Sequence, residues 1–234
     1  MNRLLKNTLS DFVHLFYPEV CAGCRRTLFD HENILCLSCH SQLPIAYDIL
    51  ESDEKVKDLF YGRASINHAR SLFFYEKIGV VQELIHQLKY EGQEKISTYL
   101  GYWMAEFVTA DPAFSTITHI VPVPIHPKRL RKRGYNQVNG FGKALAEQLN
   151  VKFIEDLLIK TVHTINQAKL GQVKRSDETN TPYAIKKGDN FKKPPHFLIV
   201  DDVITTGTTL SLCIKELQKI PEAQISIATM AISV

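Results

Sequence analysis

Beyond about residue 68, apolar positions follow two patterns that alternate along the chain. Short apolar runs predict strands over residues 69–76, 117–125, 157–162, 197–200 and 223–232. Between these runs, apolar residues at helical spacing predict helices over residues 78–90, 96–107, 137–149 and about 208–219. Strands that alternate with helices favour an α/β fold with a parallel, doubly wound sheet. Because ligands of such sheets bind beyond the carboxyl ends of the strands, the residues that follow each strand are candidate site residues.

The first 60 residues have a different texture. Residues 1–16 place apolar side chains at helical spacing with charged residues between them, which indicates an amphipathic helix and not a signal peptide. Residues 17–45 are rich in cysteine, and residues 48–58 are highly charged, as is typical of an exposed helix or linker. We therefore predict an N-terminal part over residues 1–61 and an α/β domain over residues 62–234.

Composition excludes two classes of protein. Hydrophobic residues make up 44% of the chain and charged residues 23%, which is ordinary for a globular protein and argues against disorder. No apolar run approaches the ~18–20 residues that span a bilayer. Without a targeting signal either, we expect a cytoplasmic protein that does not insert into membranes.

Four of the five cysteines form two Cys-x2-Cys pairs, Cys21 with Cys24 and Cys36 with Cys39. Disulfides are unfavourable in the cytoplasm. Four thiolates at this spacing complete the tetrahedron that Zn²⁺ prefers, and they leave no open position, so we predict a structural zinc ribbon. The alternatives are incidental surface cysteines, or His40 as a replacement ligand. Cys213 lies on a predicted helix among apolar neighbours and is interpreted as a small buried hydrophobe.

The segment FLIVDDVITTGTTL, residues 197–210, carries the most specific chemistry. A predicted buried strand ends in Asp201 and Asp202, whose carboxylates can accept hydrogen bonds from ribose hydroxyls. The loop that follows consists of Thr205, Thr206, Gly207, Thr208 and Thr209. A helix N-terminus, a glycine and neutral hydroxyls together suit a phosphate monoester. The segment therefore predicts a ribose 5-phosphate site, and the alternative is a threonine-rich turn that only caps the helix.

This segment resembles the phosphoribosyl-pyrophosphate motif of type I phosphoribosyltransferases. Together with VPVPIHPKRLRKRGYNQ (121–137), LKYEG (88–92), both cysteine pairs and the last strand, it resembles the ComF family of competence-associated proteins over nearly the whole chain. The resemblance implies a phosphoribosyltransferase-like domain preceded by a zinc ribbon, and a link to DNA uptake. It also implies that Asp201 and Asp202 hold the ribose hydroxyls, that Thr205 to Thr209 cradle the 5′-phosphate, and that the loop after residue 124 faces pyrophosphate.

One loop departs from the family pattern of Gln-x2-Leu-x4-Arg-x2-Asn. Gln167, Leu170 and Arg175 fit this spacing. Glu178 stands where asparagine is expected, and Asn180 comes two residues late. We therefore assign no role to Asn180.

Positive charge is concentrated where acidic residues are absent. The chain has a net charge of +3, yet no Asp or Glu occurs between Pro112 and Ala146, where the cations are Lys128, Arg129, Arg131, Lys132, Arg133 and Lys143. Such a cluster attracts phosphates, although a solvated basic loop is the alternative. We expect Arg133 to contact pyrophosphate because a guanidinium binds phosphate with two hydrogen bonds. The remaining cations fit a longer polyanion such as single-stranded DNA, on which Tyr135 could stack a base.

Two functional hypotheses follow, beside the alternative of a pure scaffold with a vestigial pocket. In the first, the protein binds phosphoribosyl pyrophosphate with Mg²⁺ and transfers the phosphoribosyl group to an unknown nitrogen acceptor, with Asp201, Asp202 and Arg133 in catalytic roles. In the second, the same pocket binds a ribose phosphate without catalysis, while the ribbon and basic loop engage single-stranded DNA or a competence helicase. An enzyme needs an acceptor pocket and a binding module does not, so this feature discriminates between them.

Overall fold

A computed structural model describes residues 18–47, 50–161, 181–186, 191 and 193–233. The helix predicted over residues 1–16 lies outside these ranges, as does the loop that holds Gln167, Leu170, Arg175, Glu178 and Asn180.

Five strands form the central sheet, and every neighbouring pair in it is parallel. Their order across the sheet is β1 (Ala69–Tyr75), β7 (Gln224–Ser233), β6 (His196–Ile204), β2 (His119–Pro122) and β3 (Lys152–Phe153). The inner strands β6 and β7 are almost entirely buried, which explains why they are continuous apolar runs in the sequence. The predicted parallel sheet is confirmed.

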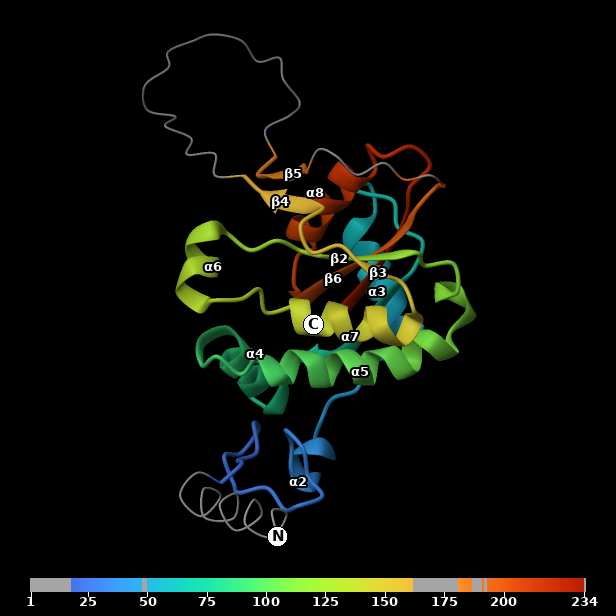
Figure 1. Cartoon of the computed structure of the whole chain (residues 1–234). Helices are drawn as coiled ribbons and strands as arrows, with labels where there is room; N and C mark the ends of the chain where they lie inside the picture. Colours follow the sequence, from blue (N-terminus) through green and yellow to red (C-terminus); the bar gives the residue numbers. More distant parts are fainter. Residues whose placement is uncertain (1–17, 48–49, 162–180, 187–190, 192, 234) are drawn as a thin grey trace, which may run out of the picture.

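Helices cover both faces of this sheet (Figure 1). Helices α4 (Val80–Tyr90), α5 (Glu94–Ala110) and α7 (Asn139–Leu149) contribute to one buried cluster, and α3 (Leu50–Phe60) and α8 (Thr208–Leu217) contribute to the other. In α4 the buried residues include Val81, Leu84, Ile85 and Leu88, the spacing of a single helical face. The fold is therefore the doubly wound α/β arrangement expected from the sequence.

The connections place a crevice between β2 and β6. From β2 the chain passes through α7 to β3, on one side of the sheet, and from β6 it passes through α8 to β7, on the other side. Two neighbouring strands whose connections leave in opposite directions define a topological switch point, and ligands of such sheets bind beyond the carboxyl ends of those strands. The carboxyl end of β6 holds Asp201 and Asp202.

Three elements differ from the prediction. The strand predicted over residues 157–162 is β4 (Leu158–Lys160), which pairs antiparallel with β5 (Tyr183–Ile185) in a separate ribbon and not with the main sheet. Strand β6 continues through the acid pair to Ile204, because β7 offers it ladder partners as far as Ile232. The basic segment is a helix, α6 (Pro127–Arg133), and not a loop.

The N-terminal cysteines lie in a small unit over residues 18–46, which we call the cysteine module. It contains one short helix, α2 (Leu37–His40), and the bridges Val20–Thr27 and Asn33–Leu35. Its last residues pair with the edge of the sheet, where Ala46 donates its N–H to the Leu72 carbonyl at 3.0 Å. A 3-10 turn, η1 (Pro112–Phe114), completes the described elements, and the boundary near residue 62 stays a prediction.

Across the described part of the chain, no helix is both long and apolar enough to cross a bilayer.

Candidate metal centre and substrate cleft

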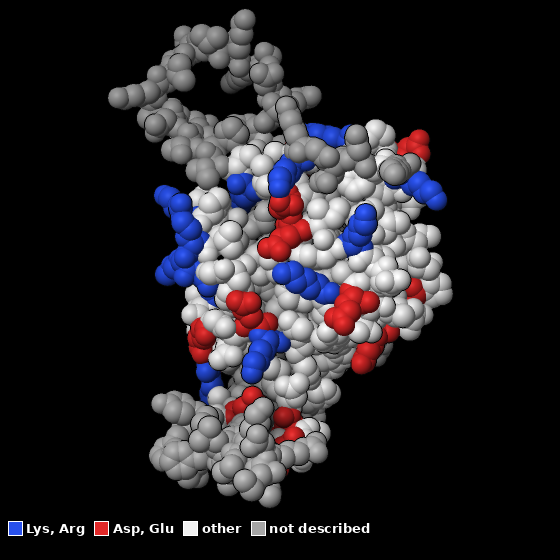
Figure 2. Space-filling model, in the orientation of Figure 1, with Lys and Arg blue, Asp and Glu red and all other residues white. Residues whose placement is uncertain are grey.

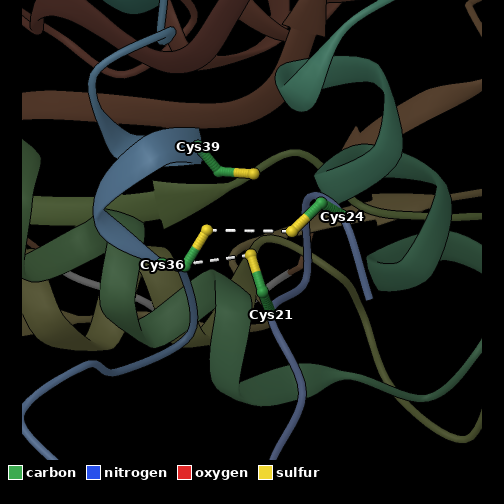
Figure 3. A group of neighbouring side chains, drawn as sticks. All are labelled: Cys21, Cys24, Cys36 and Cys39. Atoms are coloured by element: carbon green, nitrogen blue, oxygen red, sulfur yellow. Dashed lines mark hydrogen bonds between the residues drawn. The ribbon is translucent and has the colours of Figure 1, made fainter. Parts of the chain in front are cut away.

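The four paired cysteines converge on one point (Figure 3). Cys21 and Cys24 lie in a turn, Cys36 precedes α2, and Cys39 lies within it. Their sulfur atoms all lie within 4.8 Å of one another, and those of Cys24 and Cys36 are 3.7 Å apart. Four thiolates that bind one ion at ~2.3 Å in a tetrahedron are separated by roughly 3.8 Å. The residues therefore fit a Zn²⁺ ion that holds the module together.

Neighbouring groups support thiolates at this centre. The backbone N–H groups of Gly23 and Cys36 donate to the Cys21 sulfur at 3.3 and 3.2 Å, and the Arg26 guanidinium donates to the Cys36 sulfur at 3.3 Å. Donors and a nearby cation favour the ionised form of cysteine. His40 instead stacks on Trp103 of α5, with ring centroids 4.7 Å apart, so it joins the module to the α/β domain. Cys213 is buried in α8, as predicted.

The threonine–glycine loop forms a small hollow between β6 and α8. Thr205, Thr206, Gly207, Thr208 and Thr209 line it, and its volume is about 60 Å³. Gly207 has a φ of 69°, in the left-handed region that favours glycine, and is the N-cap of α8. The first N–H groups of a helix have no partner within the helix and attract anions. The donors and the position of the hollow therefore suit a phosphate group.

The two acids have different surroundings. Asp202 is buried, and its Oδ2 accepts a hydrogen bond from Gln137 Nε2 at 2.8 Å and forms an ion pair with Lys89 Nζ at 3.0 Å. Asp201 is half-buried and accepts the N–H of Asp202 at 2.9 Å. Among the described residues, no cation lies within ion-pair distance of Asp201. Burial, followed by the negative charge of Asp202, raises the pKa of Asp201 to about 8.

A larger cleft adjoins the acids. Its volume is about 720 Å³, within the usual range for small-molecule sites, and its walls include the residues that follow β2 and the end of β6. Five cations line it, namely Lys89, Arg129, Lys132, Arg133 and Lys160. The cleft and the small hollow share Asp201, Val203 and Thr209, so an acid stands between a phosphate-sized hollow and a cationic cleft.

Helix α6 supplies one wall of this cleft. His126 caps its first turn by accepting the Lys128 N–H at 3.1 Å, Pro127 occupies the first helical position, and Gly134 ends it with a φ of 89°. Positive side chains gather along the edge of the molecule where Figure 1 draws this helix (Figure 2). Arg133 donates to Gln137 Oε1, and Gln137 in turn reaches Asp202. Arg133 is thus joined to the acid pair through Gln137, and its contact with pyrophosphate stays a prediction.

Sequence reasoning missed several residues of the cleft. Lys89 pairs with Asp202 from the last turn of α4, and Gln137 holds the same carboxylate. Lys160 and Tyr183 enter from β4 and β5, with the Lys160 amine 3.0 Å from the Tyr183 hydroxyl. The segment LKYEG contains Lys89, but nothing in its spacing indicates a partner more than a hundred residues away.

Tyr135 has a structural partner. Its hydroxyl donates to the Leu88 carbonyl at 2.5 Å, and its ring packs against the buried cluster beneath the sheet. Burial raises the pKa of this hydroxyl. A ring held in this way is poorly placed to stack a nucleic-acid base, whereas Tyr90, 72% exposed at the rim of the cleft, is free on one side.

Comparison with known proteins gives a consistent set of relatives, although no protein-family model matches the chain. Competence protein F of Haemophilus influenzae is 24% identical over 226 residues, which cover 92% of this chain and 98% of that protein. Competence protein ComFC of Streptococcus pneumoniae is 26% identical, over 64% of this chain and 61% of its own length. The DNA utilization protein YhgH of Escherichia coli K12 is 28% identical, over 55% of this chain and 56% of its own length.

Solved structures that resemble this one are adenine phosphoribosyltransferases. One is 18% identical with a TM-score of 0.38, covering 64% of this chain and 74% of that chain. The enzyme from Leishmania tarentolae is 14% identical with a TM-score of 0.35, covering 76% and 87%. The assignment of the fold rests on the strand order and not on these scores.

A parallel sheet with an acid pair and a threonine–glycine loop at its switch point defines a phosphoribosyltransferase-like protein. The cysteine module before it and the competence proteins among the relatives confirm the further resemblance to the ComF family.

Proposed function

We propose that the protein binds phosphoribosyl pyrophosphate as its Mg²⁺ complex and transfers the phosphoribosyl group to a nitrogen acceptor in a process that serves competence or DNA use. The observation that carries this proposal is the order of chemistry along the crevice. A phosphate-sized hollow, an acid pair and a cationic cleft follow one another, as do the 5′-phosphate, the ribose hydroxyls and the pyrophosphate of that ligand.

In the proposed reaction, the acceptor nitrogen forms a bond to the anomeric carbon while the bond from that carbon to the pyrophosphate oxygen breaks. The electron pair of the broken bond leaves with pyrophosphate, and the acceptor loses a proton. Arg133, Lys132 and Arg129 stabilise the charge that grows on the leaving group. Asp202, held by Lys89 and Gln137, accepts a hydrogen bond from a ribose hydroxyl. Asp201, whose pKa is raised to about 8, can exchange a proton near that pH.

Mg²⁺ belongs to the ligand in this proposal. When bound, it would neutralise charge on the pyrophosphate. Apart from the acid pair, the Lys, Arg, Asp and Glu side chains that line the cleft are all cationic, so the protein residues fit a magnesium–diphosphate complex better than free Mg²⁺.

The test is pyrophosphate release from phosphoribosyl pyrophosphate and Mg²⁺ against a panel of nitrogenous acceptors, with binding measured by calorimetry. Asp201→Asn combined with Asp202→Asn should weaken binding by at least ~2 kcal/mol, because even one hydrogen bond to a charged acceptor is worth roughly 1.5–3 kcal/mol. Asp58→Asn, at an exposed position of α3, is the matched control. Equal affinity in all three proteins would contradict the site.

A second candidate function rests on the outer face of α6. Lys128 and Arg131 are exposed and do not line the cleft, so their charge is available to a polyanion outside it. With relatives named for competence and DNA utilization, single-stranded DNA is the polyanion to test, with or without a helicase partner. Binding of DNA without release of pyrophosphate with any acceptor would favour this function.

A further inference from the structure

Helix α4 contacts the cysteine module along one of its faces. This face consists of residues spaced three or four positions apart, namely Val80, Glu83, Gln87 and the C-cap residue Glu91. The turn between the first two cysteines packs closely there, because a Cβ on Gly23 would come within 3.1 Å of Val80 Cγ1.

Two polar contacts then hold this turn to the helix. The Gln87 amide donates to the Ala22 carbonyl, and the Arg25 guanidinium lies 2.8 Å from both Glu83 Oε1 and Glu91 Oε1. Gln87 is 3% exposed, whereas the Arg25 side chain is 47% exposed. Exposed ion pairs contribute little, and an unpaired buried carbonyl is costly, so the amide contact is the stronger of the two.

The other sides of α4 face the sheet and the cleft. Leu84, Ile85 and Leu88 are buried in the core, and the Leu88 carbonyl accepts the Tyr135 hydroxyl. The next residue is Lys89, whose amine lies 3.0 Å from Asp202 Oδ2. Gln87 and Lys89 are therefore two residues apart, one fixed to the cysteine module and the other to the acid pair.

We propose that Lys89 is a positioning residue for the acid pair and that the cysteine module sets the position of Lys89 through α4. The proposal rests on the proposed function in so far as its ligand is phosphoribosyl pyrophosphate. Lys89 pairs with Asp202 and fixes the direction of its Oδ2, so that the remaining lone pairs point to the ribose hydroxyls. When the module no longer holds α4, the last turn shifts and the amine leaves the carboxylate.

A double-mutant cycle tests this coupling in the full chain, with calorimetry of phosphoribosyl pyrophosphate and Mg²⁺. Lys89→Met should weaken binding about tenfold or more, and Lys89→Arg should restore part of the loss. Gln87→Met should weaken binding in the native background while zinc content stays unchanged, and should have no further effect in the Lys89→Met background. Arg25→Gln, at an exposed position, gives a milder break if Gln87→Met folds poorly. Equal effects of Gln87→Met in both backgrounds, or none in either, would overturn the proposal.

The matched control is Lys95→Ala. Lys95 pairs with Glu19 at 3.7 Å, so this change removes a contact between the cysteine module and α5 without touching α4. It should leave affinity unchanged.

A second readout needs no ligand. Asp201 faces the charges of Asp202, Lys89 and Lys160, and the two lysines hold its pKa down. In a carboxyl ¹³C NMR titration, Lys89→Met should raise the apparent pKa of the acid pair, and Gln87→Met should shift it in the same direction. If the native protein does not bind phosphoribosyl pyrophosphate, the proposed function fails and this titration still decides the coupling. An unchanged titration in Gln87→Met would overturn it.

Discussion

Asp201 and Asp202 are adjacent in sequence but not equivalent in chemistry. Lys89 and Gln137 contact Asp202 Oδ2, whereas Asp201 faces the negative charge of its neighbour and, among the described residues, accepts a hydrogen bond from one backbone N–H. The pKa of Asp201 is therefore raised to about 8. A carboxyl group with a strongly raised pKa in a cleft is typical of sites in which that group exchanges a proton.

The raised pKa predicts how stability depends on pH. The folded protein holds a proton on Asp201 up to about pH 8, while an unfolded aspartate loses it near ~3.9. Folding therefore gains most from Asp201 below pH 4, and this gain declines as pH rises from about 4 to about 8. Between pH 5 and pH 8, the free energy of unfolding should fall by at least ~1 kcal/mol more in the native protein than in Asp201→Asn.

Urea denaturation of both proteins at four pH values measures this difference. Asp58→Asn, at an exposed position, should follow the native protein at every pH. Parallel curves for the native protein and Asp201→Asn would show that Asp201 is ionised at neutral pH.

Among the elements, helix α6 has clear signals in the sequence that our prediction of a basic loop did not use. His126, Pro127 and Gly134 are the start and stop signals of a short helix, but a run of five cations within seven residues was interpreted as a loop. The helix matters for function because it places some of its positive side chains in the cleft and others outside it. Arg129, Lys132 and Arg133 line the cleft, whereas Lys128 and Arg131 do not.

This sorting predicts that two pairs of substitutions act on different ligands. Arg129→Ser with Lys132→Ser should weaken phosphoribosyl-pyrophosphate binding about tenfold, because two charges leave the pyrophosphate wall. Lys128→Ser with Arg131→Ser should leave that affinity unchanged and flatten the log–log salt slope for single-stranded DNA by about 1.4, or ~0.7 per phosphate. Calorimetry and fluorescence anisotropy at several salt concentrations measure the two effects. If both pairs of substitutions alter the binding of the same ligand and leave the binding of the other unchanged, the charges of α6 are not divided between two ligands.

Periodicity predicted the strands and helices that carry continuous apolar runs or faces, such as β6 and β7, and motif spacing predicted the cysteine centre and the threonine–glycine loop. What it did not predict depends on contacts between distant segments. Strand β3 has only two residues and is defined by pairing with β2, and β4 is assigned to a separate ribbon only through β5. Lys89 belongs to the site because α4 packs across the sheet, and no local pattern contains that information.

At the scale of the molecule, the structure joins the cysteine module, whose four sulfur atoms fit a zinc ion, to the α/β domain. The α/β domain has a buried cluster on each face of its sheet, and the few apolar side chains that the cysteine module buries, among them Leu35 and Leu43, join one of these clusters. A unit of about 30 residues cannot bury enough apolar surface to fold without a metal or another cross-link. We therefore expect the four cysteines, with a bound metal ion, to be the main source of its stability.

Removal of the metal should consequently unfold the module and leave the α/β domain folded. We expect about one zinc per chain, released by Cys36→Ser or by a strong chelator, because binding of a structural zinc supplies roughly 10–16 kcal/mol to such a unit. Hydrogen exchange followed by mass spectrometry should then lose protection over residues 18–43, while β6, β7 and α8 keep theirs. Cys213→Ser is the matched control, since that thiol is buried in α8 and its loss should not change the zinc content.

Because α4 contacts both the module and Asp202, protection should also decrease at the last turn of α4 before any change reaches β6. Protein purified without chelator that contains no zinc, or uniform loss of protection across both parts, would contradict this account.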